Sequence, residues 1–384
     1  MSAKREPSEN TTQPSPKERE LVVLLTRFGG PDAFELLEQP VPTAGSGEVR
    51  VRVMAASVQF TDVILRKGRY LSLHQSPPLV LGYDVVGEID EVGPDVMGFR
   101  VGERVADLTV IGSYARYRTL RAAGLVHVPP DVDPAEAVAL VLTWTTAYQL
   151  LHRQARVRRG QKVLVLGAAG AVGQALVTLG RLAGLEVWGT ARAEHMDLIR
   201  SLGATPFDLE NPSEQALASR GFDVVFDGIG EHGCVKSWAR VKSGGTLSAF
   251  GFSAAIEDEA KFFTLGLWLL RLHLWDWLPN GKTATFFSIT ALRKRHPEWY
   301  LADLEGLLAL LSKGVIHPRI AERIGLEDVP EAHRRLEAGG LTGKIVVCPS
   351  PERRSPREAE WATDIHTARG FGTLESDRAG RDTR

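Results

Sequence analysis

Cysteine is the residue type that this sequence most nearly lacks: Cys234 and Cys348 are its only two among 384 residues. Two cysteines so far apart exclude a disulfide framework and a zinc site built wholly from thiolates. Scarce cysteine also fits a reducing compartment, so we expect a cytoplasmic protein.

The chain also lacks a charge imbalance and a long apolar run. Its 46 lysines and arginines nearly balance its 47 aspartates and glutamates, for a formal net charge of −1, which argues against nucleic acid or another polyanion as partner. No run reaches the ~18 apolar residues of a membrane span. The two end segments hold few large apolar residues and no signal-type apolar core, so we expect disorder over 1–18 and 350–384.

What the sequence does contain is a strand that turns through glycines into a helix. The apolar run Val163–Leu166 is followed by Gly167, Gly170 and Gly173, and apolar residues then recur at helical spacing. The free N–H groups and dipole at such a helix start favour a pyrophosphate. Ala168 stands at the first glycine position of the dinucleotide fingerprint, so an ordinary strand–helix turn is the alternative.

The hydrophobic pattern divides the chain into two kinds of structure. From Leu21 to about Val138, short strands and turns predict a small β-barrel-like domain. Strand–helix alternation then predicts an α/β domain with a doubly wound parallel sheet. Thr285–Ile289 is the candidate last strand of that sheet, and a strand at 343–347 ends the ordered chain.

Seven motifs in a fixed order resemble the medium-chain dehydrogenase/reductase superfamily, in its zinc-free quinone oxidoreductase branch. They lie at 47–53, 60–70, 81–87, 101–105, 168–173, 202–204 and 342–346. The region 262–290 adds some likeness to vesicle amine transport-like members. The resemblance implies a Rossmann-type parallel sheet beside a GroES-like barrel. The expected domains are a GroES-like substrate domain at 19–138, an NADP-binding domain at 139–290, and a return to the substrate domain at 291–349.

The zinc-binding members of the superfamily place a cysteine three residues before an aspartate, and a Gly-His-Glu further on. Here Gln59 takes the cysteine position before Asp62, and Gly82-Tyr83-Asp84 replaces Gly-His-Glu. Zinc prefers thiolate and imidazole ligands, so we expect no metal. Without a Lewis acid the substrate must already be activated, which predicts a small quinone or an α,β-unsaturated carbonyl compound (an enone).

The end of the second strand predicts NADP(H) as the cofactor. Thr190 is followed by Ala191 and Arg192, where an acidic residue would bind an NAD ribose. A guanidinium suits a 2′-phosphate, although a solvated arginine is the alternative. With the residues that the resemblance adds, the predicted cofactor-binding set is Ala169, Gly170, Ala171, Val172, Gly173, Thr190, Arg192, His195, Thr146, Phe250, Gly251 and Lys344.

Three polar side chains are the predicted catalytic residues. Gln59 matches a position near the nicotinamide in the resembling branch, Tyr70 ends an Arg-x-Gly-x-Tyr motif, and Tyr83 occupies a vacated ligand position. Each can donate a hydrogen bond to an oxygen on which charge develops. Packing in the barrel is the alternative role for the tyrosines, and a plain strand-end position is that for Gln59.

The same sequence leaves two alternative functions open and predicts an oligomeric state. The chain could bind NADPH without being an enzyme, as some members of the resembling branch do. The tryptophan-rich stretch Phe262–Leu278 fits a membrane surface, although a lid or cleft wall is the more ordinary reading. We also expect a homodimer through edge-to-edge pairing of the parallel sheets, which would cover an apolar strand edge.

Overall fold

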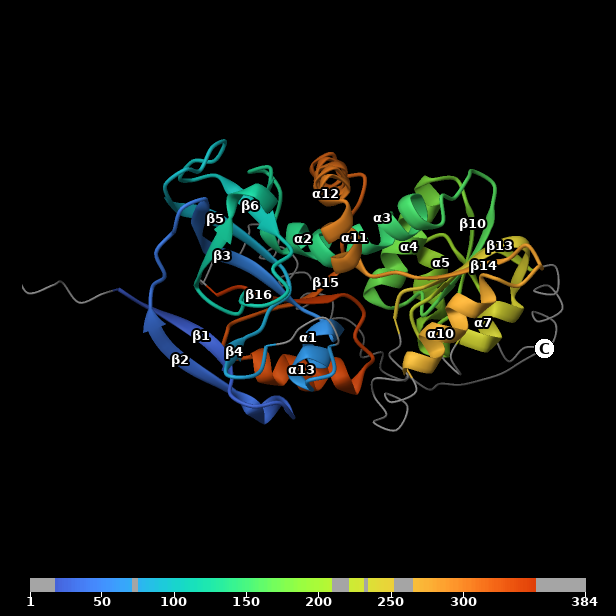
Figure 1. Ribbon diagram of the computed structural model, residues 1–384, viewed down its shortest axis with the longest axis horizontal. Coiled ribbons are helices and arrows are strands. Elements are labelled where there is room, and N and C mark those ends of the chain that lie inside the picture. Colours follow the sequence, from blue (N-terminus) through green and yellow to red (C-terminus); the bar gives the residue numbers. More distant parts are fainter. Residues whose placement is uncertain (1–17, 71–74, 209–220, 231–233, 252–264, 350–384) are drawn as a thin grey trace, which may run out of the picture. The chain divides into compact units, whose positions relative to one another are not determined.

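The computed structural model describes residues 18–70, 75–208, 221–230, 234–251 and 265–349 (Figure 1). The end segments for which we expect disorder lie outside the described residues, apart from residue 18. So does the start of the tryptophan-rich stretch, at 262–264.

Two sheets with mostly antiparallel pairing form the first part of the fold. The larger has the order β15-β16-β3-β5-β6-β8, with β7 also on β3, and the smaller has the order β2-β1-β4. Their strands are β1 (Arg19–Leu25), β2 (Phe34–Pro40), β3 (Glu48–Val58), β4 (Leu79–Val80), β5 (Val85–Val92), β6 (Arg104–Asp107), β7 (Tyr117–Arg121), β8 (Val126–His127), β15 (Ile320–Ile324) and β16 (Lys344–Val347). The end of the ordered chain therefore returns to the first sheet, as the predicted strand at 343–347 requires.

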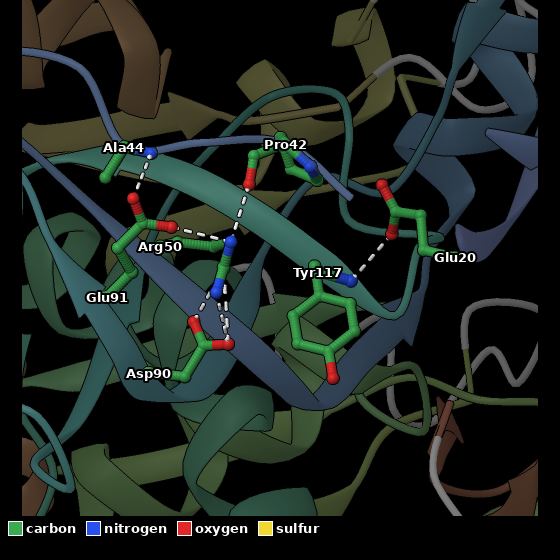
Figure 2. A network of polar contacts seen from close by, with 7 residues as sticks. All are labelled: Glu20, Pro42, Ala44, Arg50, Asp90, Glu91 and Tyr117. Atoms are coloured by element: carbon green, nitrogen blue, oxygen red, sulfur yellow. Dashed lines mark hydrogen bonds and ion pairs between the residues drawn. The ribbon is translucent and has the colours of Figure 1, made fainter. Parts of the chain in front are cut away.

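Alternation along β3 explains its two faces. Val49, Val51 and Val53 are fully buried in one hydrophobic cluster, while Arg50 between them reaches a polar network on the other face (Figure 2). The Arg50 guanidinium lies 2.9 Å from an Asp90 oxygen and 2.6 Å from a Glu91 oxygen, and it donates to the Pro42 carbonyl. These contacts tie β3 to β5 and to the segment before β3.

The second part of the fold is a six-stranded sheet in which every described pairing is parallel. Its order is β11-β10-β9-β12-β13-β14. The strands are β9 (Lys162–Leu166), β10 (Glu186–Gly189), β11 (Thr205–Pro206), β12 (Phe222–Asp227), β13 (Val241–Ala249) and β14 (Thr283–Phe286). Along β9, Val163 and Val165 enter one core cluster while Leu164 and Leu166 enter another.

Helices cover both faces of this sheet. Leu176 of α4 packs in the cluster of Val163, and Leu272 of α10 packs in that of Leu164. The predicted α/β class with a doubly wound parallel sheet is confirmed. The described α-helices are α1 (Phe60–Arg66), α2 (Pro134–Ala139), α3 (Thr145–Gln149), α4 (Ala171–Leu182), α5 (Met196–Ser201), α7 (Val235–Ala239), α10 (Leu265–Trp275), α11 (Ile289–Arg295), α12 (Pro297–Ser312) and α13 (Val329–Ala338).

The last strand of the parallel sheet differs in its bounds from the predicted Thr285–Ile289. β14 ends at Phe286, and Ile289 is already the first residue of α11. The reason is local, because the Ser288 side chain accepts a hydrogen bond from the Ala291 N–H and so caps the helix. The helix cap at Ser288 therefore leaves Phe286, two residues earlier, as the last residue of the strand.

Candidate active site

A cleft with a volume of about 510 Å³ is lined by residues of both the first sheet and the parallel sheet. Its walls are largely apolar, with a few polar side chains among them, as is common for small-molecule sites. Ten of the predicted site residues line it: Gln59, Tyr70, Tyr83, Thr146, Gly170, Ala171, Val172, Phe250, Gly251 and Lys344. The remaining five, Ala169, Gly173, Thr190, Arg192 and His195, are not among its lining residues.

The glycine turn can receive a phosphate group. A Cβ atom on Gly173 would lie 2.2 Å from the Gly167 carbonyl oxygen and 2.6 Å from Ala168 Cα, so only glycine permits this close packing of helix on turn. Helix α4 begins after Gly170, and no side chain caps its first turn. Uncapped N–H groups at the start of a 12-residue helix fit a pyrophosphate.

The predicted 2′-phosphate residues lie just beyond the end of β10. Thr190 is buried, and its Oγ1 accepts the Gly167 N–H at 3.2 Å, which fixes the glycine turn. The Arg192 side chain is 69% exposed and lies 3.8 Å from Glu194, and His195 lies 3.5 Å from the same carboxylate. Glu194 was not in the predicted set, and its carboxylate lies beside both Arg192 and His195.

A buried chain of polar side chains lies beside the cleft at Gln59. The Gln59 Nε2 donates to Asp84, and the Lys344 ammonium donates to Gln59 Oε1 at 2.9 Å. The Ser57 N–H and hydroxyl donate to Asp84 Oδ1 at 2.9 and 2.8 Å. Pairing of β16 with β3 sets Ile345 opposite Val58, which brings Lys344 beside Gln59 across the sheet.

Asp62 forms a second buried acidic site next to this chain. Its Oδ2 accepts the Gln59 N–H and the Tyr114 hydroxyl, each at 3.0 Å. Its Oδ1 has no hydrogen-bond partner among the described residues. Burial, with the nearby charge of Asp84 adding to it, raises the pKa of Asp62 to about 8. Asp62 therefore keeps its proton at neutral pH.

Asp84 and Lys344 are the acidic and the basic group of this buried network, one at each end of the Gln59 amide. Burial raises the pKa of Asp84 to about 6, against the positive charge of Lys344, which lowers it. Burial also lowers the pKa of Lys344, while Asp84 and Asp62 oppose that shift. At neutral pH the Asp84 carboxylate is thus mostly ionised, and the Gln59 amide lies between it and the Lys344 side-chain nitrogen.

Tyr70 and Tyr83 form a hydroxyl pair at the same cleft. Their oxygens lie 2.6 Å apart, and their rings meet edge to face with centroids 6.0 Å apart. Tyr83 is only 1% exposed, and burial raises its pKa above the ordinary value of a tyrosine. Tyr83 is therefore a neutral hydrogen-bonding group at physiological pH.

The side chains at the vacated zinc-ligand positions do not fit zinc. Gln59 and Tyr83 offer an amide and a neutral phenol, and both are engaged with protein partners. Across the described ranges, no group of three or more histidine, cysteine, aspartate or glutamate side chains is placed to hold a metal ion.

Several polar residues of the site were missing from the predicted set. Asp62, Asp84 and Ser57 build the buried network, and Arg69 lines the cleft. Asp62 and Asp84 are acidic residues within otherwise apolar stretches, a signal that can be found in the sequence. The contribution of Ser57 has no comparable signal, because its partner Asp84 lies 27 residues away, just before β5.

Two family models match the chain. The alcohol dehydrogenase GroES-like domain matches residues 45–130, and the zinc-binding dehydrogenase model matches residues 199–347. The first model spans β3 to β8, so the predicted GroES-like domain is confirmed there. The second spans β11 to β14 and the return to the first sheet.

Curated relatives match along most of their length. A 2-haloacrylate reductase of Burkholderia sp is 30% identical over 345 residues, covering 86% of this chain and 99% of the relative. A quinone oxidoreductase of Pseudomonas aeruginosa is 30% identical, with 84% and 97% covered. The synaptic vesicle membrane protein VAT-1 homolog of Rattus norvegicus is 29% identical, with 87% and 85% covered.

Solved structures show the same fold. A mycobacterial protein solved in complex with NADPH is 28% identical to this chain, with a TM-score of 0.73. The match covers 86% of this chain and all of that protein.

Proposed function

Because the chain belongs to the medium-chain dehydrogenase/reductase superfamily, we propose that this oxidoreductase is a zinc-independent enzyme that passes hydride from NADPH to a quinone or an α,β-unsaturated carbonyl compound. Residues 139–290 would hold the cofactor, and 19–138 with 291–349 the acceptor. The proposal goes beyond family membership in naming the cofactor and the acceptor class.

One observation carries the proposal. A single cleft contains the start of α4, at Gly170–Val172, and the donors Gln59 and Tyr70. The first can hold a dinucleotide phosphate, and the others can hold a carbonyl oxygen. NADPH, once bound, would supply the hydride and become NADP⁺.

The residues of the cleft have a limited task in this reaction. The β-carbon of the acceptor takes the hydride, its π electrons move to the carbonyl oxygen, and a proton from solvent then completes the reduced product. Gln59 and Tyr70 stabilise the charge on that oxygen, and any one such donor is worth about 3 kcal/mol at the transition state. Apolar side chains such as Phe250 and Ile289 exclude water from the reacting atoms.

The names of the relatives support this acceptor class. A 2-haloacrylate carries a carbon–carbon double bond conjugated with a carboxyl group, and a quinone carries one conjugated with a ketone. Both accept hydride at carbon while charge grows on oxygen. The mycobacterial structure that holds NADPH supports the choice of cofactor.

The test is NADPH oxidation followed at 340 nm against a panel of quinones, enones, haloacrylates and simple aldehydes, with NADH in parallel. We expect turnover with conjugated acceptors and not with simple aldehydes or, in reverse, with alcohols. An enzyme that oxidises simple alcohols and is silent on every conjugated acceptor contradicts the proposal.

An exposed apolar face on α10 supports a second candidate, a non-enzymatic NADPH-binding protein at a membrane surface. Leu267, Leu270 and Leu274 are each more than half exposed, while Trp268 and Trp275 pack inward on the core. No helix among the described residues is long and apolar enough to cross a membrane. Co-sedimentation with anionic liposomes, lost in a triple Leu→Ser variant of this face, would favour this candidate.

A further inference from the structure

We infer that Asp84 and Lys344 are positioning residues that hold the Gln59 amide in one orientation, so that Gln59 presents an N–H to the oxygen of the acceptor. The inference rests on the proposed function. It explains how the hydrogen-bond donor to the acceptor oxygen is held in place.

The chemistry of the two partners fixes the orientation. A carboxylate only accepts hydrogen bonds and an ammonium only donates them. Asp84 must therefore face Gln59 Nε2, and Lys344 must face Oε1, as both contacts show. Both partners are buried, with Asp84 at 0% and Lys344 at 7% exposure, so water offers neither end of the amide an alternative.

In this orientation, one N–H of the Gln59 amide remains available to a ligand in the cleft. Nε2 carries two protons, and Asp84 accepts one. In the part of the chain that the structure describes, no second acceptor is recorded for Nε2, and Gln59 lines the cleft. A carbonyl oxygen, which gains negative charge as hydride arrives at carbon, is the group that this spare N–H suits.

Replacing Asp84 by asparagine should upset this arrangement from both ends. The Ser57 N–H donates to the Oδ1 position at 2.9 Å, so the new side chain must put its oxygen there. Its NH₂ group then faces Gln59 Nε2, donor against donor. If Gln59 turns over to escape, its own NH₂ meets the Lys344 ammonium. Asp84→Asn therefore removes the single favoured orientation without changing the size of the side chain.

A double-mutant cycle tests whether Asp84 acts through Gln59. We expect Gln59→Leu to lower kcat for a good enone by about a hundredfold and Asp84→Asn by about tenfold, with the Kd for NADPH unchanged. On the Gln59→Leu background, Asp84→Asn should cost less than about twofold more. An equal loss in both backgrounds, or no loss from Asp84→Asn, overturns the inference.

Asp303→Asn is the matched control, because Asp303 is also a buried carboxylate and accepts a hydrogen bond from another glutamine, Gln149 Nε2, at 3.1 Å. Neither Asp303 nor Gln149 is among the residues that line the cleft. We expect kcat within about threefold of the unmodified protein. A loss as large as that from Asp84→Asn would mean that the loss follows from removing any buried carboxylate, and would overturn the inference.

A measurement without turnover separates this inference from the proposed function. In glutamine-labelled protein, the side-chain amide signal that Gln59→Leu removes should shift as Asp84 titrates, with a midpoint near pH 6. Other titratable groups that interact electrostatically with Asp84 are Lys344, Asp62, Tyr114 and Tyr300. A signal that lies at the same chemical shift in the unmodified protein and in Asp84→Asn overturns the orientation. An enzyme that reduces no acceptor but shows the shift overturns only the proposed function.

Discussion

The hydroxyl oxygens of Tyr70 and Tyr83 lie 2.6 Å apart, so one of these two phenols must donate to the other. Their pair therefore has one proton to offer to the cleft and not two. Tyr83 is 1% exposed and Tyr70 is partly exposed, which makes Tyr70 the one placed to meet an acceptor and Tyr83 its support.

Tyr70→Phe should accordingly slow turnover more than Tyr83→Phe. Tyr70→Phe removes a donor to a charged oxygen, which costs about a hundredfold in kcat. Tyr83→Phe removes only the hydroxyl that holds Tyr70 in place. The Kd for NADPH should stay unchanged in both variants, measured by fluorescence titration beside steady-state kcat. If neither variant changes turnover of a good enone, backbone or water stabilises the charge and the assignment is wrong.

Arg192→Ala should weaken NADPH binding by about ten- to a hundredfold and leave NADH binding nearly unchanged. The guanidinium is 69% exposed and only 3.8 Å from Glu194, so a 2′-phosphate must compete with that carboxylate. Arg200→Ala is the matched control, because Arg200 is an exposed arginine of α5 paired with Asp197 at 2.6 Å. Equal losses for both cofactors would show that Arg192 only supports the fold.

The buried carboxyl of Asp62 predicts a pH-dependent stability. In the unfolded chain the group has a pKa near 3.8, and in the folded protein its pKa is about 8. Between these values only the native state holds the proton, so the contribution of Asp62 to stability is greatest below about pH 4 and falls as pH rises to about 8. The total effect is on the order of a few kcal/mol.

Asp62→Asn has no titrating group at this position, so the free energy of unfolding of this variant should decline less as pH rises. The free energy of urea unfolding, measured from pH 5 to 8.5, should fall less steeply in this variant than in the unmodified protein. Asp197→Asn, at a side chain that is 96% exposed, should leave the slope unchanged. A slope that Asp62→Asn does not alter would mean that Asp62 is ionised in the native state.

The purified protein should carry no stoichiometric zinc and should keep its activity after treatment with a chelator. The reason is that Gln59 and Tyr83 stand where a thiolate and an imidazole would be needed. Elemental analysis by mass spectrometry checks this directly. Near one zinc per chain, with activity lost on chelation, is the contrary result.

The protein should sediment as a homodimer at micromolar concentration. Among the described strands, β14 is the last at one end of the parallel sheet. A strand edge at the end of a sheet favours association with a second copy of the chain. A clean monomer in sedimentation velocity would refute pairing at this edge.

The sequence predicted the parts of this protein that depend on neighbours along the chain. Glycine spacing at 167–173 predicted the tight turn before α4, because only glycine tolerates the 2.2 Å approach that a Cβ of Gly173 would make to the Gly167 oxygen. Hydrophobic periodicity predicted the parallel sheet and the helices on its faces. The predicted end of β14 at Ile289 was wrong, since the Ser288 cap starts α11 there although the apolar pattern continues to Ile289.

Only the tertiary structure decided which polar groups meet. Lys344 was expected to approach the cofactor, and it bonds to Gln59, 285 residues away. Sheet register is the cause, since Ile345 pairs with Val58 and so carries Lys344 to Gln59, while Asp84 precedes the neighbouring strand β5. Register depends on packing of the whole sheet and leaves no local pattern. Local sequence determined the glycine turn before α4, and long-range strand pairing determined the buried polar network beside the cleft.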